Sequence, residues 1–347
     1  MDNKTIMRHI GKNLYLLSEN NYIHVDNDDI LITNENGQNT RIPPSLIENI
    51  VVFGNNTISS FLLRFCSKHN IGLSYVSEYG KLYGRFSGEF NRCIVLRKKQ
   101  YDLYQTNKSF SFSKNIILAK AVNSKNNLLQ CAKDATDENK KDALIVAANT
   151  ISSFKEMLLN CQTDEELLGI EGKISQIYFS HFDSMLKTKD EKMLFIERSR
   201  RPPENFCNCL LSFLYTLYTN DITSALESAG LDSYLGYNHK LHPGRQSLSL
   251  DVLEEFRAVI IDRFVITIIN RKQIAPKDFS NKEHVISLSE EGRKKLLKLW
   301  EDYKETKIKH SLYNKEVEIK LLPYLQAQLL AQFIRGDIDE YPPFVKG

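Results

Sequence analysis

The sequence has few of the features that mark exported or membrane-bound proteins. Its 347 residues open without a basic and apolar leader, and no apolar run approaches the length of a membrane span. The six cysteines are scattered and form no Cys-x-x-Cys pair, so we expect reduced thiols in the core and no zinc site. These absences predict a cytoplasmic protein that makes no contact with a membrane.

The chain also lacks internal repeats, low-complexity tracts and a large excess of charge. Its net charge of +3 is too small to identify a nucleic-acid-binding protein, so any such case depends on where the charge is concentrated. Apolar residues make up 42% of the chain and charged residues 26%, as in ordinary globular proteins. The length suffices for about two domains.

Residues 1–90 are predicted to form a small, mostly β domain, which carries no visible catalytic residues. Short segments rich in β-branched and aromatic residues alternate with turn-forming clusters of Asn, Asp, Pro and Gly. A helix is expected at Ser59–His69, where Phe61, Leu62 and Phe65 share one face. The expected strands are Asn13–Ser18, Tyr22–Val25, Asp29–Thr33, Ile47–Phe53, Gly72–Val76 and Lys81–Phe86.

The composition changes near Asn91. Between Asn91 and Lys125, eight basic residues stand against a single acid, Asp102, with aromatic residues interleaved. This pattern fits contact with a phosphate backbone, and it fits a solvated junction between domains equally well. We assign residues 91–112 as a basic junction.

Residues 113–347 are predicted to form a larger, all-α domain, which gives an α+β fold overall. The tail Gly336–Lys346 contains two prolines and is expected to pack back as an extended cover. The expected helices are Ser113–Ala132, Asn139–Asn160, Asp164–Leu186, Glu204–Ala229, Ser247–Asn270, Ser289–Lys307 and Val317–Arg335.

Two acidic signals lie in the helical part. Asp251, Glu254 and Glu255 are spaced i, i+3 and i+4, so they share a helix face, and such carboxylates repel one another unless a cation lies between them. His239 and His242 lie just upstream, in a segment that Pro243 and Gly244 keep from being helical. The pattern predicts a metal site, although a solvated amphipathic helix would give the same spacing.

The second signal is Glu171, which stands in the apolar stretch GIEGKISQIYF. An unpaired carboxylate costs several kcal/mol to bury, so Glu171 either has a partner or faces water. The flanking Gly169 and Gly172 favour close approach of another backbone or a substrate.

Between these signals, RSRRPPENFCNCLLSFLYTLY carries a compact basic cluster, Arg198, Arg200 and Arg201. With GIEGKISQIYF and GLDSYLGYNHKLHPGRQSLSLDVLEEFR, this stretch resembles the ordered motifs of the CRISPR-associated adaptation endonuclease, the integrase that inserts new spacers. The likeness extends over the whole chain. The tail QAQLLAQFIRGDIDEYPPF is similar to the subtype I-C branch. Ser233, Asn238 and Glu255 depart from the family's usual residues.

The resemblance implies a metal site and a reaction. Glu171, His239 and Glu254 match the family's three metal ligands, and Asp251 matches its additional catalytic acid, an orienting group or auxiliary ligand. Two carboxylates and an imidazole suit Mg²⁺ or Mn²⁺. The implied chemistry is attack of a DNA 3′-hydroxyl on a phosphodiester of the repeat, and the same site with water is an endonuclease. The DNA backbone would be held by Arg198, Arg200, Arg201, Arg245 and Arg257.

The resemblance also implies partners: double-stranded spacer precursor and CRISPR repeat DNA, a homodimer formed through the β domain, and a small ferredoxin-like companion protein. Two other functions compete with this one. A non-catalytic DNA-binding scaffold of the same fold would have degenerate acids, whereas all four key positions are occupied here. A hydrolase of small phosphoesters would need a closed pocket without basic grooves, and the clustered arginines count against it.

Ionic strength separates the DNA enzyme from the small-molecule hydrolase. If the chain contacts several phosphates, its affinity for duplex DNA should fall by about 10³-fold or more between 50 and 200 mM salt, through counterion release. Fluorescence anisotropy over a salt series measures this slope. A flat slope, together with salt-independent cleavage of a small phosphoester, would support the hydrolase instead.

Overall fold

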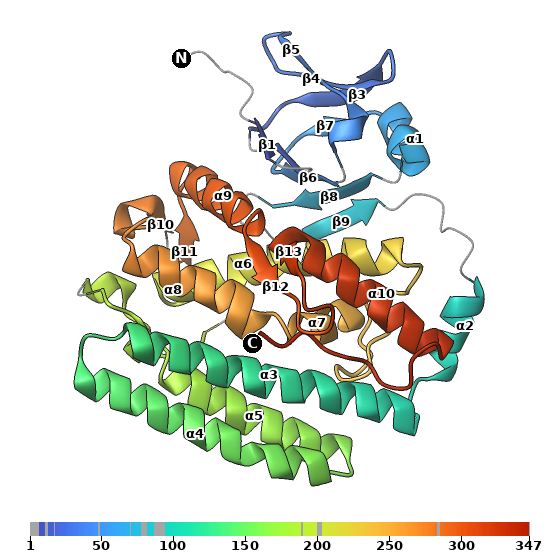
Figure 1. The fold of residues 1–347 in the computed structure, drawn as a ribbon. Helices are drawn as coiled ribbons and strands as arrows, with labels where there is room; N and C mark the ends of the chain where they lie inside the picture. The colour runs from blue at the N-terminus through green and yellow to red at the C-terminus, as the bar shows by residue number, and fades with distance from the viewer. Residues whose placement is uncertain are drawn as a thin grey trace. The chain divides into compact units, whose positions relative to one another are not determined.

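The computed structural model describes residues 7–10, 13–16, 18–47, 49–69, 71–77, 82–86, 94–188, 190–199, 203–282 and 285–346 (Figure 1). The chain divides into two compact units. One comprises Met1–Arg92 with Arg293–Glu305, and the other comprises Cys93–Gly292 with Thr306–Gly347.

The first unit contains two sheets. Strands β1 (Met7–Ile10), β2 (Asn13–Leu16), β6 (Asn49–Phe53), β8 (Gly72–Val76) and β9 (Leu82–Phe86) form a mixed sheet in the order β1-β2-β6-β8-β9. Its centre is parallel, because β2 and β8 both run alongside β6 in the same direction. The second sheet has the order β5-β4-β3-β7, from β3 (Tyr22–Asp26), β4 (Asp29–Thr33), β5 (Asn39–Ile42) and β7 (Thr57–Ile58).

Both sheets share one hydrophobic core with helix α1 (Ser60–His69). The central strands supply Leu14, Ile50 and Leu73, which are aligned across β2, β6 and β8. Such parallel strands become stable only when covered, and α1 contributes Leu62 and Phe65 to the cover. The segment Arg293–Glu305 belongs to the same unit, and the Arg293 guanidinium lies 5.6 Å from the centre of the Phe53 ring.

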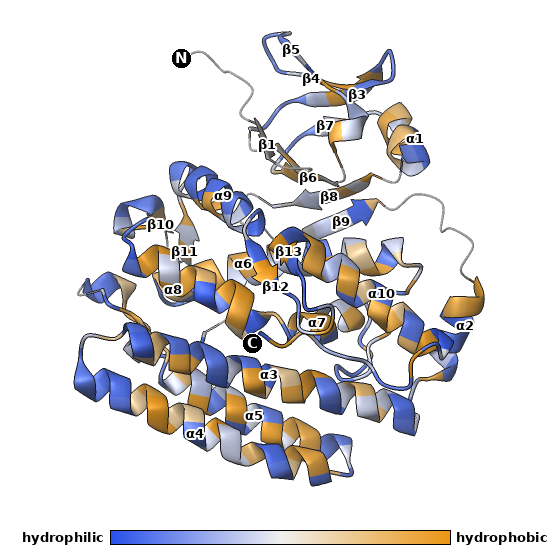
Figure 2. Ribbon diagram, viewed as in Figure 1, coloured by the Kyte–Doolittle hydropathy of each residue, from blue (hydrophilic) through white to orange (hydrophobic). Residues whose placement is uncertain are grey.

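The second unit begins with α2 (Ile94–Asp102) and a group of long helices, α3 (Asn107–Asp134), α4 (Glu138–Asn160) and α5 (Asp164–Ser180), which lie side by side. In α4 the buried positions Leu144, Ala147, Ala148 and Ile151 follow the helical period. Figure 2 shows hydrophobic and hydrophilic positions alternating along these helices, as expected when each buries one face.

The largely buried helix α6 (Phe206–Ser228) packs against α10 (Leu322–Arg335) and α7 (Ser247–Leu253). A turn at residues 254–256 follows α7 and leads into a π-helical segment, Arg257–Asp262, and then α8 (Arg263–Asn270). Two hairpins, β10 (Phe279–Lys282) with β11 (Val285–Leu288) and β12 (Lys307–Lys309) with β13 (Glu316–Glu318), complete the unit. Helix α9 (Glu290–Lys304) starts in this unit and belongs from Arg293 onward to the first unit.

The predicted α+β class, with a β-rich region followed by a helical region, is confirmed. Several details differ. The part expected to be all α contains two β hairpins, β10–β11 and β12–β13. The stretch expected as a junction contains helix α2, and the expected helix Ser247–Asn270 is interrupted at residues 254–256. The expected helix from Val317 starts only at Leu322, because Pro323 sets the first helical turn and the preceding residues pair as a hairpin.

The tail after α10 turns back along α3. Gly336 ends the helix in the left-handed conformation, with φ of 88°, which glycine adopts without steric cost. Side chains of Asn115, Asn123 and Asn126 on α3 then donate hydrogen bonds to carbonyls of Tyr341, Phe344 and Lys346. Of the helices in the described ranges, none is long and apolar enough to cross a bilayer.

The start of α5 offers a test of how the helical unit is held. Thr163 and Glu166 form a reciprocal capping box, so Thr163→Ala should lower the free energy of unfolding by about 1 kcal/mol. Urea denaturation measures the change. Thr150→Ala, the same substitution at an exposed position inside α4, should be neutral or slightly stabilising, and equal losses in both variants would contradict the capping role.

Candidate active site

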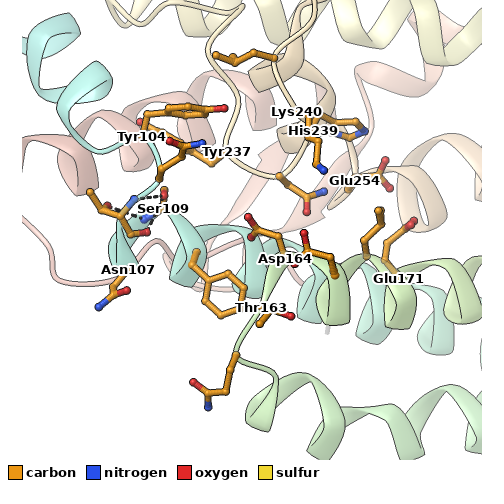
Figure 3. A pocket seen from close by; sticks show the side chains of 18 of the residues that line it. Tyr104, Asn107, Ser109, Thr163, Asp164, Glu171, Tyr237, His239, Lys240 and Glu254 are labelled. Atoms are coloured by element: carbon orange, nitrogen blue, oxygen red, sulfur yellow. Dashed lines mark hydrogen bonds between the residues drawn. The ribbon is translucent and has the colours of Figure 1, made fainter.

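The helical unit contains a cleft of about 1000 Å³. Its walls come from the segment between α2 and α3, the start of α5, the loop that precedes α7, and the turn that follows α7. The three residues predicted as metal ligands line it: Glu171, His239 and Glu254. Figure 3 shows Glu171 rising from α5 on one side, with Glu254 and His239 on the other.

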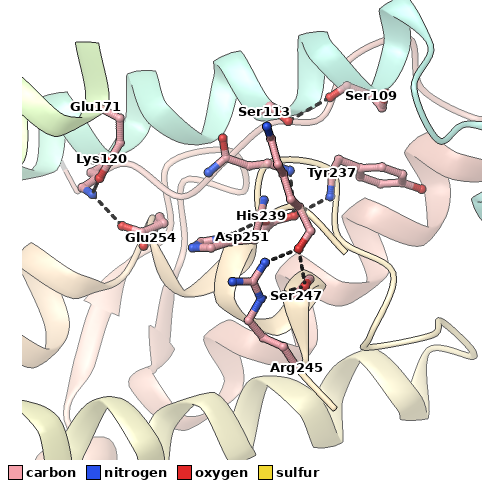
Figure 4. Close-up of polar contacts among 12 residues, drawn as sticks. Ser109, Ser113, Lys120, Glu171, Tyr237, His239, Arg245, Ser247, Asp251 and Glu254 are labelled. Atoms are coloured by element: carbon pink, nitrogen blue, oxygen red, sulfur yellow. Dashed lines mark hydrogen bonds and ion pairs between the residues drawn. The ribbon is translucent and has the colours of Figure 1, made fainter. Parts of the chain in front are cut away.

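A lysine joins the two glutamates. The ammonium of Lys120, on α3, forms ion pairs with Glu171 and with Glu254, whose Oε2 lies 2.9 Å away (Figure 4). Ser175 also donates a hydrogen bond to Glu171 at 2.9 Å. Lys120 and Glu254 are buried, and the Glu171 side chain is 22% exposed. The partner that Glu171 needs inside its apolar stretch is therefore this buried cation.

Sequence reasoning missed Lys120. In the sequence, Lys120 is one of the eight basic residues between Asn91 and Lys125, and the charge pattern alone gives it no individual role. The available signal was its setting in IILAKAV, where an isolated charge in an apolar helical run needs a buried partner just as Glu171 does.

Asp251 stabilises the conformation of the loop that carries His239. Its carboxylate is fully buried and accepts hydrogen bonds from the backbone N–H groups of Tyr237 at 2.6 Å, Asn238 at 3.1 Å and His239 at 2.8 Å. A further hydrogen bond of 2.7 Å joins its Oδ1 to Nδ1 of the His239 ring. Asp251 therefore fixes both the backbone and the ring orientation of the histidine.

Two further contacts hold this loop. A Cβ atom added to Gly236 would lie 2.8 Å from Oδ2 of Asp251 and 2.6 Å from the Ser247 carbonyl carbon, so only glycine fits. Gln100, on α2, is fully buried and donates to the carbonyl of Asp232 at 2.8 Å, while Tyr237 donates its hydroxyl to the Gln100 carbonyl at 3.0 Å. Helix α2 is thus a support for the His239 loop.

Adjacent glutamates face different surroundings. Glu254 lines the cleft, while Glu255 is buried against the C-terminal tail, where Tyr341 donates to it at 2.9 Å. Burial alone would raise the pKa of Glu254, but the charges of Arg257, Lys120 and His239 lower it to about 2. Burial raises the pKa of Glu255 to about 8 against the effect of its hydrogen bonds. Glu254 is the acid that is charged at neutral pH and open to the cleft.

The arginines expected to hold DNA occupy different places. Arg257 and Arg245 line the cleft, and Arg257 forms an ion pair of 3.1 Å with Glu254. The Arg198 guanidinium donates to Asn208 Oδ1 at 2.8 Å and lies 5.6 Å from the centre of the Tyr215 ring, inside the helical unit. Arg200 and Arg201 lie outside the described residues.

The remaining sequence signals are less central. His242 is exposed, and its Nδ1 lies 2.9 Å from the Pro243 carbonyl. A Cβ atom added to Gly169 or Gly172 would meet no described atom within 4 Å. These glycines lie on the exposed face of α5, so the expected close approach of another backbone is not observed.

The donor set fits a divalent cation, with one condition. Glu171, Glu254 and His239 line the cleft and offer the oxygen and imidazole ligands that Mg²⁺ and Mn²⁺ accept, and the buried Glu254 Oε2 contacts the Lys120 ammonium at 2.9 Å. As the described side chains stand, however, no three of His, Cys, Asp or Glu surround a common point, because the Lys120 ammonium lies between the glutamates. An ion would therefore bind where the lysine now supplies the positive charge.

Comparison with known proteins identifies the family. A family model described as CRISPR associated protein Cas1 matches residues 14–302. The CRISPR-associated endonuclease Cas1 1 of Chlorobaculum tepidum is 39% identical over 339 residues, which cover 96% of this chain and 97% of the relative. The Cas1 2 endonuclease of Rhodospirillum rubrum is 32% identical over 343 residues, which cover 97% and 99%.

Solved structures of related proteins have the same fold as this chain. A Cas1 protein from Thermotoga maritima has a TM-score of 0.79 at 26% identity, and the match covers 96% of this chain and 99% of that one. A casposase bound to its integration product has the same fold, with a TM-score of 0.79 at 22% identity over 95% of this chain and 93% of that one. The chain belongs to the Cas1 family of CRISPR adaptation endonucleases and integrases, as its motifs predicted.

The central lysine can be tested through stability. Lys120→Met leaves two carboxylates facing each other, so in a chelator it should lower the free energy of unfolding by about 2 kcal/mol, less than the ~3–5 kcal/mol of a fully buried pair because Glu171 still meets water. Mn²⁺ should restore most of the loss, measured by urea denaturation with and without the ion.

Lys141→Met is the matched control, since Lys141 forms an exposed ion pair with Glu138 in α4. Its effect should stay below ~0.5 kcal/mol and should not depend on Mn²⁺. A Lys120→Met variant that is destabilised equally in chelator and in Mn²⁺ would show that no ion replaces the lysine.

Proposed function

We propose that this chain is a metal-dependent integrase that joins spacer DNA to the CRISPR repeat, with Glu171, His239 and Glu254 as its metal ligands. The observation that carries the proposal is their position on one cleft, with His239 fixed by the buried Asp251. With Nδ1 engaged by Asp251, Nε2 is the ring nitrogen left for the ion.

In the joining reaction, the 3′-hydroxyl oxygen of the spacer forms a new bond to a phosphorus of the repeat, and the bond from that phosphorus to the neighbouring 3′ oxygen breaks. The proton of the attacking hydroxyl ends on solvent or on the leaving oxygen. Because one phosphodiester bond replaces another, the reaction needs no external source of energy. A bound Mg²⁺ or Mn²⁺ ion would neutralise charge on the phosphate and lower the pKa of the attacking hydroxyl. With water in place of the hydroxyl, the products are those of an endonuclease.

The chain's own side chains prepare the cleft for this chemistry. Asp251 has each carboxylate oxygen engaged by donors from the His239 loop, which supports an orienting role over direct metal binding. Arg257 and Arg245 present positive charge to the cleft, where phosphate oxygens would lie. Arg198, Arg200 and Arg201 remain part of the proposed DNA contact as a basic cluster in the sequence.

The assembly is also part of the proposal. One solved structure with this fold is a Cas6-RT-Cas1–Cas2 complex, with a TM-score of 0.81 at 20% identity. The match covers 100% of this chain and 37% of that one, and at this identity it supports the fold alone. From the sequence resemblance we propose a homodimer through the β-rich unit, a small ferredoxin-like companion and a subtype I-C system. A cytoplasmic location follows from the proposed substrate, the cell's own CRISPR array.

One observation favours a second function. The double ion pair of Lys120 with Glu171 and Glu254 is also what a scaffold with a degenerate metal site would show, because the lysine satisfies both carboxylates without an ion. A scaffold would bind DNA with the usual salt dependence and would catalyse neither joining nor cleavage.

An assay of strand joining distinguishes the integrase from the scaffold. A short duplex with free 3′-hydroxyls is incubated with a supercoiled repeat-bearing plasmid, Mg²⁺ or Mn²⁺, and the companion protein. The parent chain should join the strands, and His239→Ala and Glu254→Gln should each reduce joining by at least ~100-fold with DNA binding retained, because each removes a metal ligand.

His242→Ala is the matched control, since this exposed histidine is three residues away and does not line the described cleft; it should join at the parent rate. Joining that survives both ligand substitutions would place the chemistry elsewhere. Tight, salt-sensitive DNA binding by a parent that joins nothing would establish the scaffold.

A further inference from the structure

We propose that the C-terminal tail, Asp337–Lys346, is a positioning element of the active site that acts through Glu255 and Asn123 to hold Glu254 in the cleft. The inference rests on the proposed function, because it assigns the tail a part in the same reaction. We call the contacts among Asn123, Glu255, Gln326 and the tail residues Tyr341–Lys346 the tail brace.

The first step concerns the backbone around Glu254. Helix α7 ends at Leu253, and the π-helical segment begins only at Arg257. Within the turn between them, Glu254 N–H donates to the Asp251 carbonyl at 3.2 Å and Phe256 N–H donates to the Leu253 carbonyl at 3.0 Å, both over a tighter spacing than in an α-helix. The α-helical hydrogen-bond pattern is therefore interrupted at Glu254, although its backbone keeps helical angles, and contacts from outside the helix add to what holds this turn.

The second step is that the tail supplies such contacts at the next residue. The Glu255 carboxylate, fully buried, accepts hydrogen bonds from the Tyr341 hydroxyl at 2.9 Å and the Phe344 N–H at 2.5 Å. Gln326, on α10, donates to the same carboxylate at 3.1 Å and to the Tyr341 hydroxyl at 2.8 Å. Glu255 is therefore held by two other parts of the chain, helix α10 and the tail.

The third step links the tail to the helix that carries Lys120. Asn123 lies one turn further along α3 and donates through Nδ2 to the Glu255 carbonyl at 2.7 Å and to the Phe344 carbonyl at 2.9 Å. Its Oδ1 accepts from the Lys346 N–H at 2.9 Å. One face of α3 therefore binds the cleft glutamates through Lys120 and the tail brace through Asn123.

The fourth step is that the polar groups of the tail brace are not needed to attach the tail, because aromatic packing already does so. Phe344 and Tyr341 are fully buried, and the Phe344 ring lies 5.6 Å from that of Phe256, so aromatic contacts already attach the tail. Within the described residues, the groups that donate to the Glu255 side chain are all uncharged, and burying its polar carboxyl group there costs free energy that an apolar residue would not. The polar contacts add direction, since they fix the orientation of the turn that bears Glu254.

The decisive variant is Tyr341→Phe, which removes one hydroxyl from the brace and keeps the buried ring. At saturating DNA and Mn²⁺ it should lower kcat for strand joining by about tenfold with little change in the DNA KM, because a small displacement of a catalytic ligand mainly affects the transition state. It should also change the electron paramagnetic resonance spectrum of bound Mn²⁺ and weaken Mn²⁺ binding severalfold.

Two matched controls hold the same tail without touching Glu255. Asn115 donates to the Tyr341 carbonyl at 3.2 Å and Asn126 donates to the Lys346 carbonyl at 2.7 Å. Asn115→Ala and Asn126→Ala should keep kcat within about twofold of the parent value. They should also leave the shape of the Mn²⁺ spectrum unchanged, even where they lower the melting temperature.

The outcomes separate the brace from the proposed function. A parent chain that neither joins strands nor binds Mn²⁺ overturns the proposed function, and the brace with it. A parent that joins, with Tyr341→Phe at the parent kcat and spectrum, overturns the brace alone. If all three variants lose activity in proportion to their melting temperatures, the tail has a structural role only, and the brace is likewise overturned.

Discussion

The candidate active site depends on one electrostatic constraint: two carboxylates from different parts of the chain can meet only if positive charge lies between them. Here α5 supplies Glu171, the turn after α7 supplies Glu254, and α3 supplies the Lys120 ammonium that joins them. A divalent cation is the other charge that satisfies this geometry. The lysine therefore keeps the two glutamates at one cleft in the protein by itself.

The histidine is placed by a different device. His239 lies in an irregular loop, where no helix or strand sets the direction of a side chain. The buried Asp251 carboxylate collects the loop's N–H groups and the ring nitrogen, and Gly236 allows the loop to approach it closely. Asp251 thereby fixes the loop backbone and the His239 ring, and helix α2 also supports the loop through Gln100.

Glu254 and Glu255 show how environment divides the roles of two identical residues. Nearby cations lower the pKa of Glu254 to about 2, whereas burial among uncharged donors raises that of Glu255 to about 8. Glu254 lines the cleft, and Glu255 is turned toward the tail, where Tyr341 donates a hydrogen bond to it. Helix α3 touches both arrangements, so the cleft and the C-terminus share one structural support.

The sequence by itself determined the α+β class and the family, because hydrophobic periodicity and motif spacing are local properties of the chain. It also predicted Glu171, His239 and Glu254 as metal ligands, and the structure places these three residues on one cleft. It left open which acid of the pair Glu254–Glu255 faces the cleft, since both fit the helical spacing and the deciding contacts come from the tail, almost ninety residues away. The role of Lys120 was equally hidden. Its partners lie on other helices, and only tertiary packing brings an isolated lysine between two distant glutamates.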